Sequence, residues 1–249
     1  MKKRLDIELY FSAFAEFFLE VLEQGSEELK LMNDTINEYL VNLTPRRDEL
    51  FSKMEKYALE HHVPIMDIIG IEALLQLLRI HNPSSILEIG SAIGYSALRM
   101  SDTLPDASIV TLERNQDRIA AARSFIKEAN KEQCITLIEG DALELASEAE
   151  KHGPYDLIFI DAAKGQYVRF FERYEPLLAP EGIIISDNVL YKGQVVIPEE
   201  TIAHRRGRAL VRKIKHFNSW IMEHPDYHTV ILPIGDGMAI SKKKKIMQG

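Results

Sequence analysis

Between residues 85 and 187, short runs rich in β-branched and apolar residues alternate with amphipathic segments, and this alternation constrains the fold more than any other feature. The apolar runs cover residues 85–90, 108–113, 135–140, 156–161 and 182–187, and helices are expected to begin at Gly94, Gln116, Ala142 and Gly165. Such an alternation forms right-handed βαβ units, with a parallel sheet and helices on both faces. The predicted fold class is α/β and doubly wound, and a chain of 249 residues with 46% hydrophobic residues can bury one such core.

The chain before and after this region has different patterns. Residues 229–234 and 238–241 are apolar and flank Gly235-Asp236-Gly237, a tight-turn sequence that predicts an antiparallel hairpin. Such a hairpin is unusual for a dinucleotide dehydrogenase. Near the N-terminus, helices are expected over residues 28–43, 45–61 and 66–80, with Thr44 as the N-cap and Pro45 at the first position of the second helix. We therefore predict N-terminal helices, then a Rossmann-like parallel sheet closed by an antiparallel hairpin.

Charge and cysteine content exclude several classes of protein. The 30 basic and 38 acidic residues give a net charge of −8, which argues against coating nucleic acid or an anionic membrane unless basic residues cluster locally. The single cysteine, Cys134, excludes an intrachain disulfide and suits a reducing, cytoplasmic location; we expect it to be a buried strand residue. Residues 9–22 are apolar but too short to span a bilayer, so we interpret them as an amphipathic helix or as a stretch outside the domain.

The first predicted strand ends in Glu88-Ile89-Gly90-Ser91-Ala92-Ile93-Gly94. A dinucleotide site favours GxGxxG, which lets the backbone approach a pyrophosphate, whereas here Ala92 stands between the glycines and Glu88 precedes them. A ligand with a positively charged amino group and no phosphate fits this loop better. Taken alone, the spacing is equally compatible with a simple tight turn.

The next two strands also end in acidic residues. Glu113 follows the second strand and could accept both hydrogen bonds from a ribose diol, a feature that NAD would share. Asp141-Ala142 follows the third strand, where an acceptor would meet the exocyclic amine of an adenine, and Asp141 could also cap the helix expected from Ala142. Three strand ends thus point to one nucleoside.

The fourth and fifth strands end in Asp161 and in Asp187-Asn188. Since the carboxyl ends of parallel strands meet at the same edge of a sheet, these side chains should converge. Two carboxylates and one amide oxygen suit Mg²⁺, or Mn²⁺, whereas none of the eight histidines forms an HExxH-type pair. The alternative is that both aspartates only cap helices.

Lys164 lies three residues after Asp161. A divalent cation beside a lysine favours its neutral form, so Lys164 could act as a general base towards a substrate hydroxyl held at the metal. The alternative is a solvated lysine at a helix start.

These residues together resemble the metal-dependent class I O-methyltransferases of the catechol and caffeoyl-coenzyme A type. The specific parts are Glu88-x-Gly90-x-x-x-Gly94-Tyr95-Ser96, Asp161-Ala162-x-Lys164-x-x-Tyr167 and Asp187-Asn188-x-x-x-x-Gly193. The resemblance implies S-adenosylmethionine as cofactor, a homodimer, Lys164 and Asp161 as catalytic residues, and metal ligation by Asp161, Asp187 and Asn188. It implies cofactor contacts from Met66, Glu88, Gly90, Tyr95, Ser96, Glu113, Asp141, Ala142 and Asp161.

The resemblance begins near Met32 and runs to about Lys243. We therefore expect residues 1–31 to be an extension and residues 32–249 to be one domain, with a helical cap over residues 32–81 and a Rossmann-like core over residues 82–243. Met32 could be the natural start of the protein.

Within this family, the chain is most similar to bacterial methyltransferases that convert 5-hydroxyuridine to 5-methoxyuridine at the tRNA wobble position. The similarity covers His61-His62-Val63-Pro64-Ile65-Met66, the loop from Gly90 to Ala97, Asp161 to Tyr167, and His224-Pro225-Asp226-Tyr227. It implies an anticodon stem-loop as partner. The 5-hydroxyl is enol-like and acidic, as in a catechol, so the same chemistry would serve.

A basic segment, residues 204–216, supports an RNA substrate because it contains no acidic residue despite the acidic chain. Its basic residues could contact phosphates, and Lys242 to Lys245 would extend the patch. The candidate RNA contacts are Arg205, Arg206, Arg208, Arg212 and Lys213; Lys215 belongs to the same run. The alternative is a solvated helix face.

Three other functions remain open at this point. The acceptor could be a small catechol or phenol, the chain could be a non-catalytic RNA-binding protein built on a methyltransferase fold, or it could be an NAD-dependent dehydrogenase. The first would methylate free catechols, the second would be insensitive to loss of Asp187, and the third would bind NAD.

Overall fold

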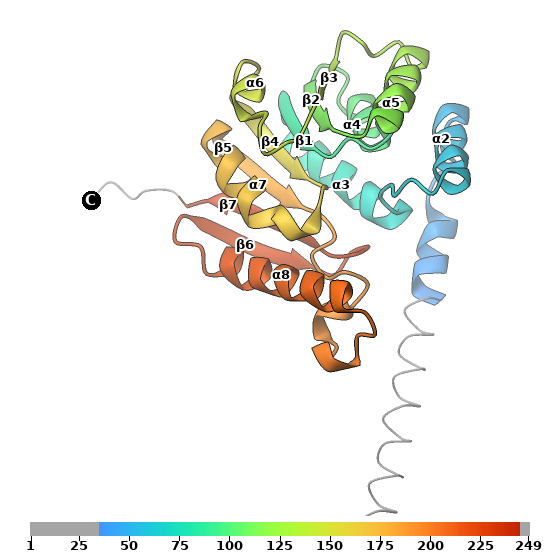
Figure 1. Ribbon diagram of the computed structural model, residues 1–249. Coiled ribbons are helices and arrows are strands. Elements are labelled where there is room, and N and C mark those ends of the chain that lie inside the picture. Colours follow the sequence, from blue (N-terminus) through green and yellow to red (C-terminus); the bar gives the residue numbers. More distant parts are fainter. Residues whose placement is uncertain (1–34, 245–249) are drawn as a thin grey trace, which may run out of the picture. The chain divides into compact units, whose positions relative to one another are not determined.

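The computed structural model describes residues 35–244 (Figure 1). Contacts divide the chain into two compact units, Met1–Arg46 and Arg47–Gly249. In the first unit the described residues 35–43 are helical. The predicted amphipathic helix at residues 9–22, the start of the helix at residue 28, the boundary at residues 31 and 32, and Lys245 lie outside the described residues.

The second unit contains a seven-stranded sheet in the order β3-β2-β1-β4-β5-β7-β6. All neighbouring strands from β3 to β5 are parallel, whereas β7 is antiparallel to both β5 and β6. The predicted α/β fold with a C-terminal antiparallel hairpin is therefore confirmed. The strands are β1 Ser85–Ile89, β2 Ser108–Glu113, β3 Ile135–Glu139, β4 Tyr155–Ile160, β5 Leu178–Ser186, β6 Tyr227–Leu232 and β7 Met238–Lys243.

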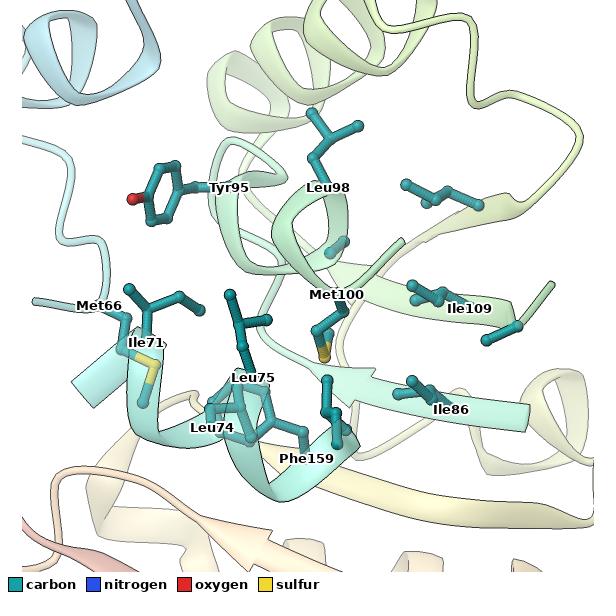
Figure 2. Close-up of a cluster of buried hydrophobic side chains, with 14 of the residues drawn as sticks. Met66, Ile71, Leu74, Leu75, Ile86, Tyr95, Leu98, Met100, Ile109 and Phe159 are labelled. Carbon is teal, nitrogen blue, oxygen red and sulfur yellow. The ribbon is translucent and has the colours of Figure 1, made fainter. Parts of the chain in front are cut away.

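Both faces of the sheet are covered, because successive side chains of a strand point to opposite faces. In β1, Ile86 joins the cluster formed with the first helices, whereas Leu87 and Ile89 join the cluster on the other face. Figure 2 shows part of the first cluster, with Leu74 and Leu75 near Phe159 and with Ile86 and Ile109 on two further strands. The helices of this face are α2 Glu49–Glu60, α3 Ile68–His81, α4 Tyr95–Thr103 and α5 Gln116–Glu128.

The opposite face is covered by α6 Ala146–Glu150, α7 Tyr167–Tyr174 and α8 Arg205–Met222. Figure 1 shows α7 and α8 together over the sheet. Two predicted helix starts were wrong on this face. Asp141 accepts a bond from the Leu143 amide in a local turn, so α6 begins only at Ala146, and the segment after Asp161 first forms a short 3-10 turn, Lys164–Gln166.

The predicted start of the second helix was also wrong. Thr44 ends the preceding helix instead of capping the next, because its amide and its hydroxyl both bond to the Leu40 carbonyl. Helix α2 begins at Glu49, after Asp48 in an extended conformation, so Pro45 lies outside it.

Cys134 is half-buried and immediately precedes β3, so the expectation of a buried strand residue was wrong too. It is a free cysteine. Among residues 35–244, none of the helices has the length and apolar character needed to cross a bilayer.

The hairpin turn between β6 and β7 packs against two segments that border the carboxyl edge of the sheet. A side chain on Gly235 would collide with the Asp67 carboxylate, and one on Gly237 would collide with Leu190. Both glycines have positive φ, which favours residues without a Cβ. The turn therefore lies between the start of α3 and the segment that follows β5.

Candidate active site

The ends of β1, β4 and β5 lie side by side and bring the predicted acidic residues together. The Asp161 amide donates to the Ile89 carbonyl at 3.0 Å, and the Asp187 amide donates to the Ile160 carbonyl at 3.0 Å. The last residue of β1 thus binds the residue that follows β4, and the last residue of β4 binds the residue that follows β5. This edge is the expected position of a ligand site in an open parallel sheet.

Asn188 connects the two aspartates. Its Nδ2 donates to Asp187 Oδ2 at 2.7 Å and to Asp161 Oδ1 at 3.2 Å. Its backbone φ of 61° lies in the left-handed region, which asparagine tolerates better than most residues. The three residues predicted as metal ligands therefore form one contiguous cluster.

Lys164 lies in the same cluster. Its Nζ donates to Asn188 Oδ1 at 2.7 Å and lies 5.9 Å from the centroid of the Tyr191 ring. The Lys164–Gln166 turn carries this side chain back over the end of β5. The predicted base and the predicted metal ligands are thus adjacent.

The electrostatics of the cluster fit a cation. Burial raises the pKa of Asp161, although the positive charge of Lys164 opposes this shift. Burial also raises the pKa of Asp187, and the neighbouring charge of Asp161 raises it further. A half-buried carboxylate and a buried one with a single lysine nearby are under-compensated, a condition that a bound divalent cation would relieve.

The donor set also fits a hard divalent cation such as Mg²⁺, which prefers oxygen ligands. Turning the Asn188 amide over would present its Oδ1 beside the two carboxylates. Within residues 35–244, no group of three His, Cys, Asp or Glu side chains could hold a metal, so the candidate ligands are two carboxylates and one amide.

The loop after β1 approaches this cluster closely. A Cβ on Gly90 would collide with the Asp161 carbonyl oxygen, and the φ of Gly90 is +105°. Glycine is therefore required at this position for both space and conformation. The loop therefore packs at Gly90 directly against the backbone of Asp161.

Glu113 holds the loop to the end of β2. Its Oε2 accepts from the Ala92 amide at 2.9 Å, and its Oε1 accepts from the Arg114 and Asn115 amides, each at 2.9 Å. A carboxylate has about four acceptor positions, so about one remains open, on Oε2. Glu113 could therefore accept one hydrogen bond from a ribose hydroxyl, whereas the sequence predicted that it accepts two.

Glu88 has no exposed surface, which corrects the expectation that it meets a cofactor directly. It lies beneath the loop and accepts hydrogen bonds from the Ser96 and Thr111 hydroxyls. Burial raises its pKa to about 7, while those two hydrogen bonds partly oppose the shift. Its role in this geometry is to orient Ser96 at the start of α4.

Replacing Glu88 with Gln should change how stability depends on pH. Below about pH 4.5 the carboxyl is protonated in both states, whereas at higher pH the unfolded chain ionises first and the folded chain only near pH 7. Glu88 therefore lowers the stability of the folded state by up to about 3 kcal/mol as the pH rises through this range. Urea unfolding of the cofactor-free proteins should show Glu88→Gln gaining that amount relative to wild type between pH 4.5 and 8. A constant difference across this range would contradict the assignment.

The other predicted cofactor residues occupy different environments. Asp141 is partly exposed and accepts from Arg114 Nη1 at 3.1 Å, and its bond from the Leu143 amide lowers its pKa. The Ala142 carbonyl accepts from the Tyr174 hydroxyl at 2.5 Å. Met66 is buried in the first core cluster, so any contact from it would come mainly from its backbone.

Tyr95 is also directed into the protein. Its ring is 2% exposed, and its hydroxyl donates to Glu55 and accepts from Arg99. The predicted cofactor contact could therefore come only from the first backbone groups of α4, not from the hydroxyl.

The structure divides the predicted RNA contacts into two sets. Arg208 bonds to the Ile202 carbonyl, and Arg212 pairs with Glu199 at 2.9 Å. Arg205, Arg206 and Lys213 are exposed and have no recorded partner among the described residues. A Cβ on Gly165 would lie 3.2 Å from Lys213 Cδ, so Lys213 packs against the backbone that follows Lys164.

Several residues at the site were not assigned from the sequence. The Tyr191 ring borders Lys164, the Asp236 carboxylate accepts from the Lys192 amide, and the Tyr167 hydroxyl donates to the Asp187 carbonyl at 2.8 Å. Of the residues in this region, Tyr167 and Gly193 belong to the family motifs found in the sequence, and that membership was the only sequence signal for a role at the site. The turn containing Asp236 is remote in sequence, and local patterns do not predict its contact.

The parallel sheet, its antiparallel C-terminal pair and the acidic cluster at the carboxyl edge of the sheet fit a methyltransferase of the α/β class. Residues 42–244 match the profile of the O-methyltransferase family, and the chain belongs to this family. It is 29% identical over 232 residues to caffeoyl-CoA O-methyltransferase of Medicago sativa. The matched region covers 90% of this chain and 94% of the Medicago protein.

Two solved structures extend the comparison. A Staphylococcus aureus protein provisionally described as a caffeoyl-CoA O-methyltransferase has a TM-score of 0.79 and 38% identity, covering 83% of this chain and 98% of that one. An O-methyltransferase from Bacillus cereus in complex with SAH has a TM-score of 0.72 and 27% identity, covering 84% and 97%.

Proposed function

We propose that this protein is an S-adenosylmethionine-dependent, divalent-metal-assisted O-methyltransferase that methylates 5-hydroxyuridine at the wobble position of tRNA. The observation that carries the methyl-transfer part is the cluster of Asp161, Asp187, Asn188 and Lys164 beside the Gly90 loop. Family membership and the relative solved with SAH, the demethylated cofactor, support the choice of cofactor.

The cofactor would lie along the ends of β1, β2 and β3. The open position on Glu113 Oε2 would accept from its ribose, and Asp141 would accept from its adenine amine. The first turn of α4, with Ser96 oriented by Glu88, would border its amino acid end. These contacts would hold the cofactor's methyl group over the carboxyl ends of β4 and β5.

Asp161, Asp187 and Asn188 would hold the divalent cation, Mg²⁺ or Mn²⁺. When bound, the cation supplies charge that favours the ionised form of the acceptor hydroxyl. Lys164 Nζ, which lies beside Asn188, would take the proton of that hydroxyl. The ionised acceptor oxygen would then bond to the methyl carbon of the bound cofactor as its carbon–sulfur bond breaks, which would leave SAH as the second product.

The RNA part of the proposal is supported by the free cations on α8. Arg205 and Arg206 at its start and Lys213 beside Gly165 would contact phosphates of the anticodon loop near the reacting base. The 5-hydroxyl of the base is acidic, so it would ionise at the metal as a catechol does. A small phenolic acceptor would need none of these three cations.

The acceptor is tested by comparing tRNA that lacks the modification with a simple catechol under the same conditions. The proposal predicts a much higher kcat/KM for the tRNA, with the label recovered as 5-methoxyuridine. Efficient turnover of the catechol together with inert tRNA would overturn the RNA part and leave the O-methyltransferase part in place.

Charge reversal of Arg205, Arg206 and Lys213 should weaken tRNA binding and reduce its salt dependence. Each lost phosphate contact lowers the slope of log K against log salt by about 0.7 to 0.9, so three would lower it by about 2 to 3. Fluorescence anisotropy with an anticodon stem-loop measures this slope. Reversal of the exposed Lys127, in the last turn of α5, provides the control. A triple variant with wild-type affinity and slope would refute the RNA contact.

A further inference from the structure

We infer that Arg99 is a positioning residue for the cofactor site, acting through Tyr95 and Glu72. The inference rests on the proposed use of S-adenosylmethionine. It assigns a function to hydrogen-bonded and charged side chains around Arg99 that take no part in the proposed methyl transfer itself. Arg99 is 7% exposed and lies on α4, one turn after Tyr95.

The guanidinium of Arg99 joins two helices. Its Nη1 donates to the Tyr95 hydroxyl at 2.9 Å, and its Nη2 pairs with Glu72 of α3. Its central carbon lies 5.1 Å from the centroid of the Phe51 ring, on α2. The planar fork of arginine can hold both partners at once, whereas the single ammonium of a lysine cannot reproduce that geometry.

The network continues from Tyr95 into α2. The Tyr95 hydroxyl donates to Glu55 Oε1 at 2.7 Å, and Arg47 Nε lies 2.6 Å from the same oxygen. Positive and negative groups therefore alternate from Arg47 through Glu55 and Arg99 to Glu72. A buried cation that is paired and hydrogen-bonded in this way fixes the geometry of its neighbours.

Two ends of this network adjoin the predicted cofactor contacts. Tyr95, labelled in Figure 2, is the first residue of α4. It directly follows the left-handed Gly94 and directly precedes Ser96, which bonds to Glu88. Glu72 lies in the first turns of α3, whose N-cap Asp67 follows Met66. Arg99 therefore fixes the separation between the Met66 segment and the first turn of α4.

This placement predicts an effect on cofactor affinity rather than on chemistry. Without the guanidinium, Tyr95 keeps its bond to Glu55 but loses its tie to α3, so the start of α4 can shift. The metal ligands and Lys164 follow β4 and β5 and are not held by this network. Turnover at saturating cofactor should therefore be preserved.

The test is titration calorimetry with SAH on the full chain, together with steady-state kinetics. Arg99→Met should raise the dissociation constant for SAH and the KM for S-adenosylmethionine about tenfold, with kcat within about twofold of wild type. Arg99→Lys should show most of this loss. Glu72→Gln, which keeps the shape of the side chain, should move both constants in the same direction even if Arg99→Met folds poorly.

Two controls separate positioning from general destabilisation. Tyr155→Phe removes another buried hydroxyl bond, to the Ala149 carbonyl at 2.6 Å, and should lower stability without changing SAH affinity. Arg79→Met, on the exposed side of α3, should change neither. Unchanged SAH affinity in folded Arg99→Met and Glu72→Gln, or a fall in kcat instead of affinity, would overturn the inference. A wild-type protein that does not bind SAH would overturn the proposed function and this inference with it.

Discussion

Replacing Asp187 with Ala is expected to lower methyl transfer by about 10³-fold or more, since the substitution removes a charged ligand from the proposed cation site. The fold should survive, because Asp187 is a buried carboxylate whose pKa is raised by burial and by Asp161. Its removal relieves repulsion, so the metal-free variant should be at least as stable as wild type at pH 8. Initial rates with labelled cofactor, measured beside urea unfolding, test both statements.

Asp156→Ala provides the matched control. Asp156 lies at the opposite end of β4 from Asp161 and accepts from the Ser84 and Ser85 amides at 2.8 Å and 3.1 Å. Its loss should reduce stability and leave the specific activity of the folded protein near that of wild type. If Asp187→Ala kept substantial activity, the metal assignment would be wrong, whereas the absence of methyl transfer by the wild-type protein would support a non-catalytic role on a methyltransferase fold.

Lys164→Met should produce the second large effect, a loss of about 10²- to 10⁴-fold in kcat, the usual contribution of a positioned general base. Binding of SAH should change little, because Lys164 bonds to Asn188 and not to the Gly90 loop. At higher pH the acceptor hydroxyl ionises without help, so the deficit should shrink. A pH profile of kcat for both proteins measures this.

The control for Lys164 is Lys151→Met. Lys151 is exposed and pairs with Glu148 just before β4, at the opposite edge of the sheet from Lys164. It should have wild-type activity. A Lys164→Met deficit that stayed constant across the pH range would assign Lys164 to holding Asn188 rather than to proton transfer.

The sequence predicted the fold and the chemical cluster because both depend on local, periodic signals. Alternating strands and helices specify a parallel sheet, and in such a sheet the residues after β4 and β5 must be neighbours. Asp161, Asp187 and Asn188 therefore converge as predicted, with Lys164 beside them. The metal itself and the RNA partner remain predictions.

Features that depend on contacts distant in sequence could not be predicted in this way. Glu88 is covered by α4, and the direction of the Tyr95 side chain depends on Glu55, 40 residues earlier. Arg212 is neutralised by Glu199, which lies in a 3-10 turn, Glu199–Thr201, with no clear periodic pattern. In each case tertiary packing, not local propensity, decides what the side chain contacts.

The most direct test of the central claim is transfer of a labelled methyl group from S-adenosylmethionine to unmodified tRNA, before and after removal of divalent metal. We predict that the label enters 5-methoxyuridine, that chelation abolishes transfer, and that added Mg²⁺ or Mn²⁺ restores it. Label on another nucleoside, or transfer that survives complete chelation, would contradict the account of Asp161, Asp187 and Asn188 as a metal site serving a wobble-uridine O-methyltransferase.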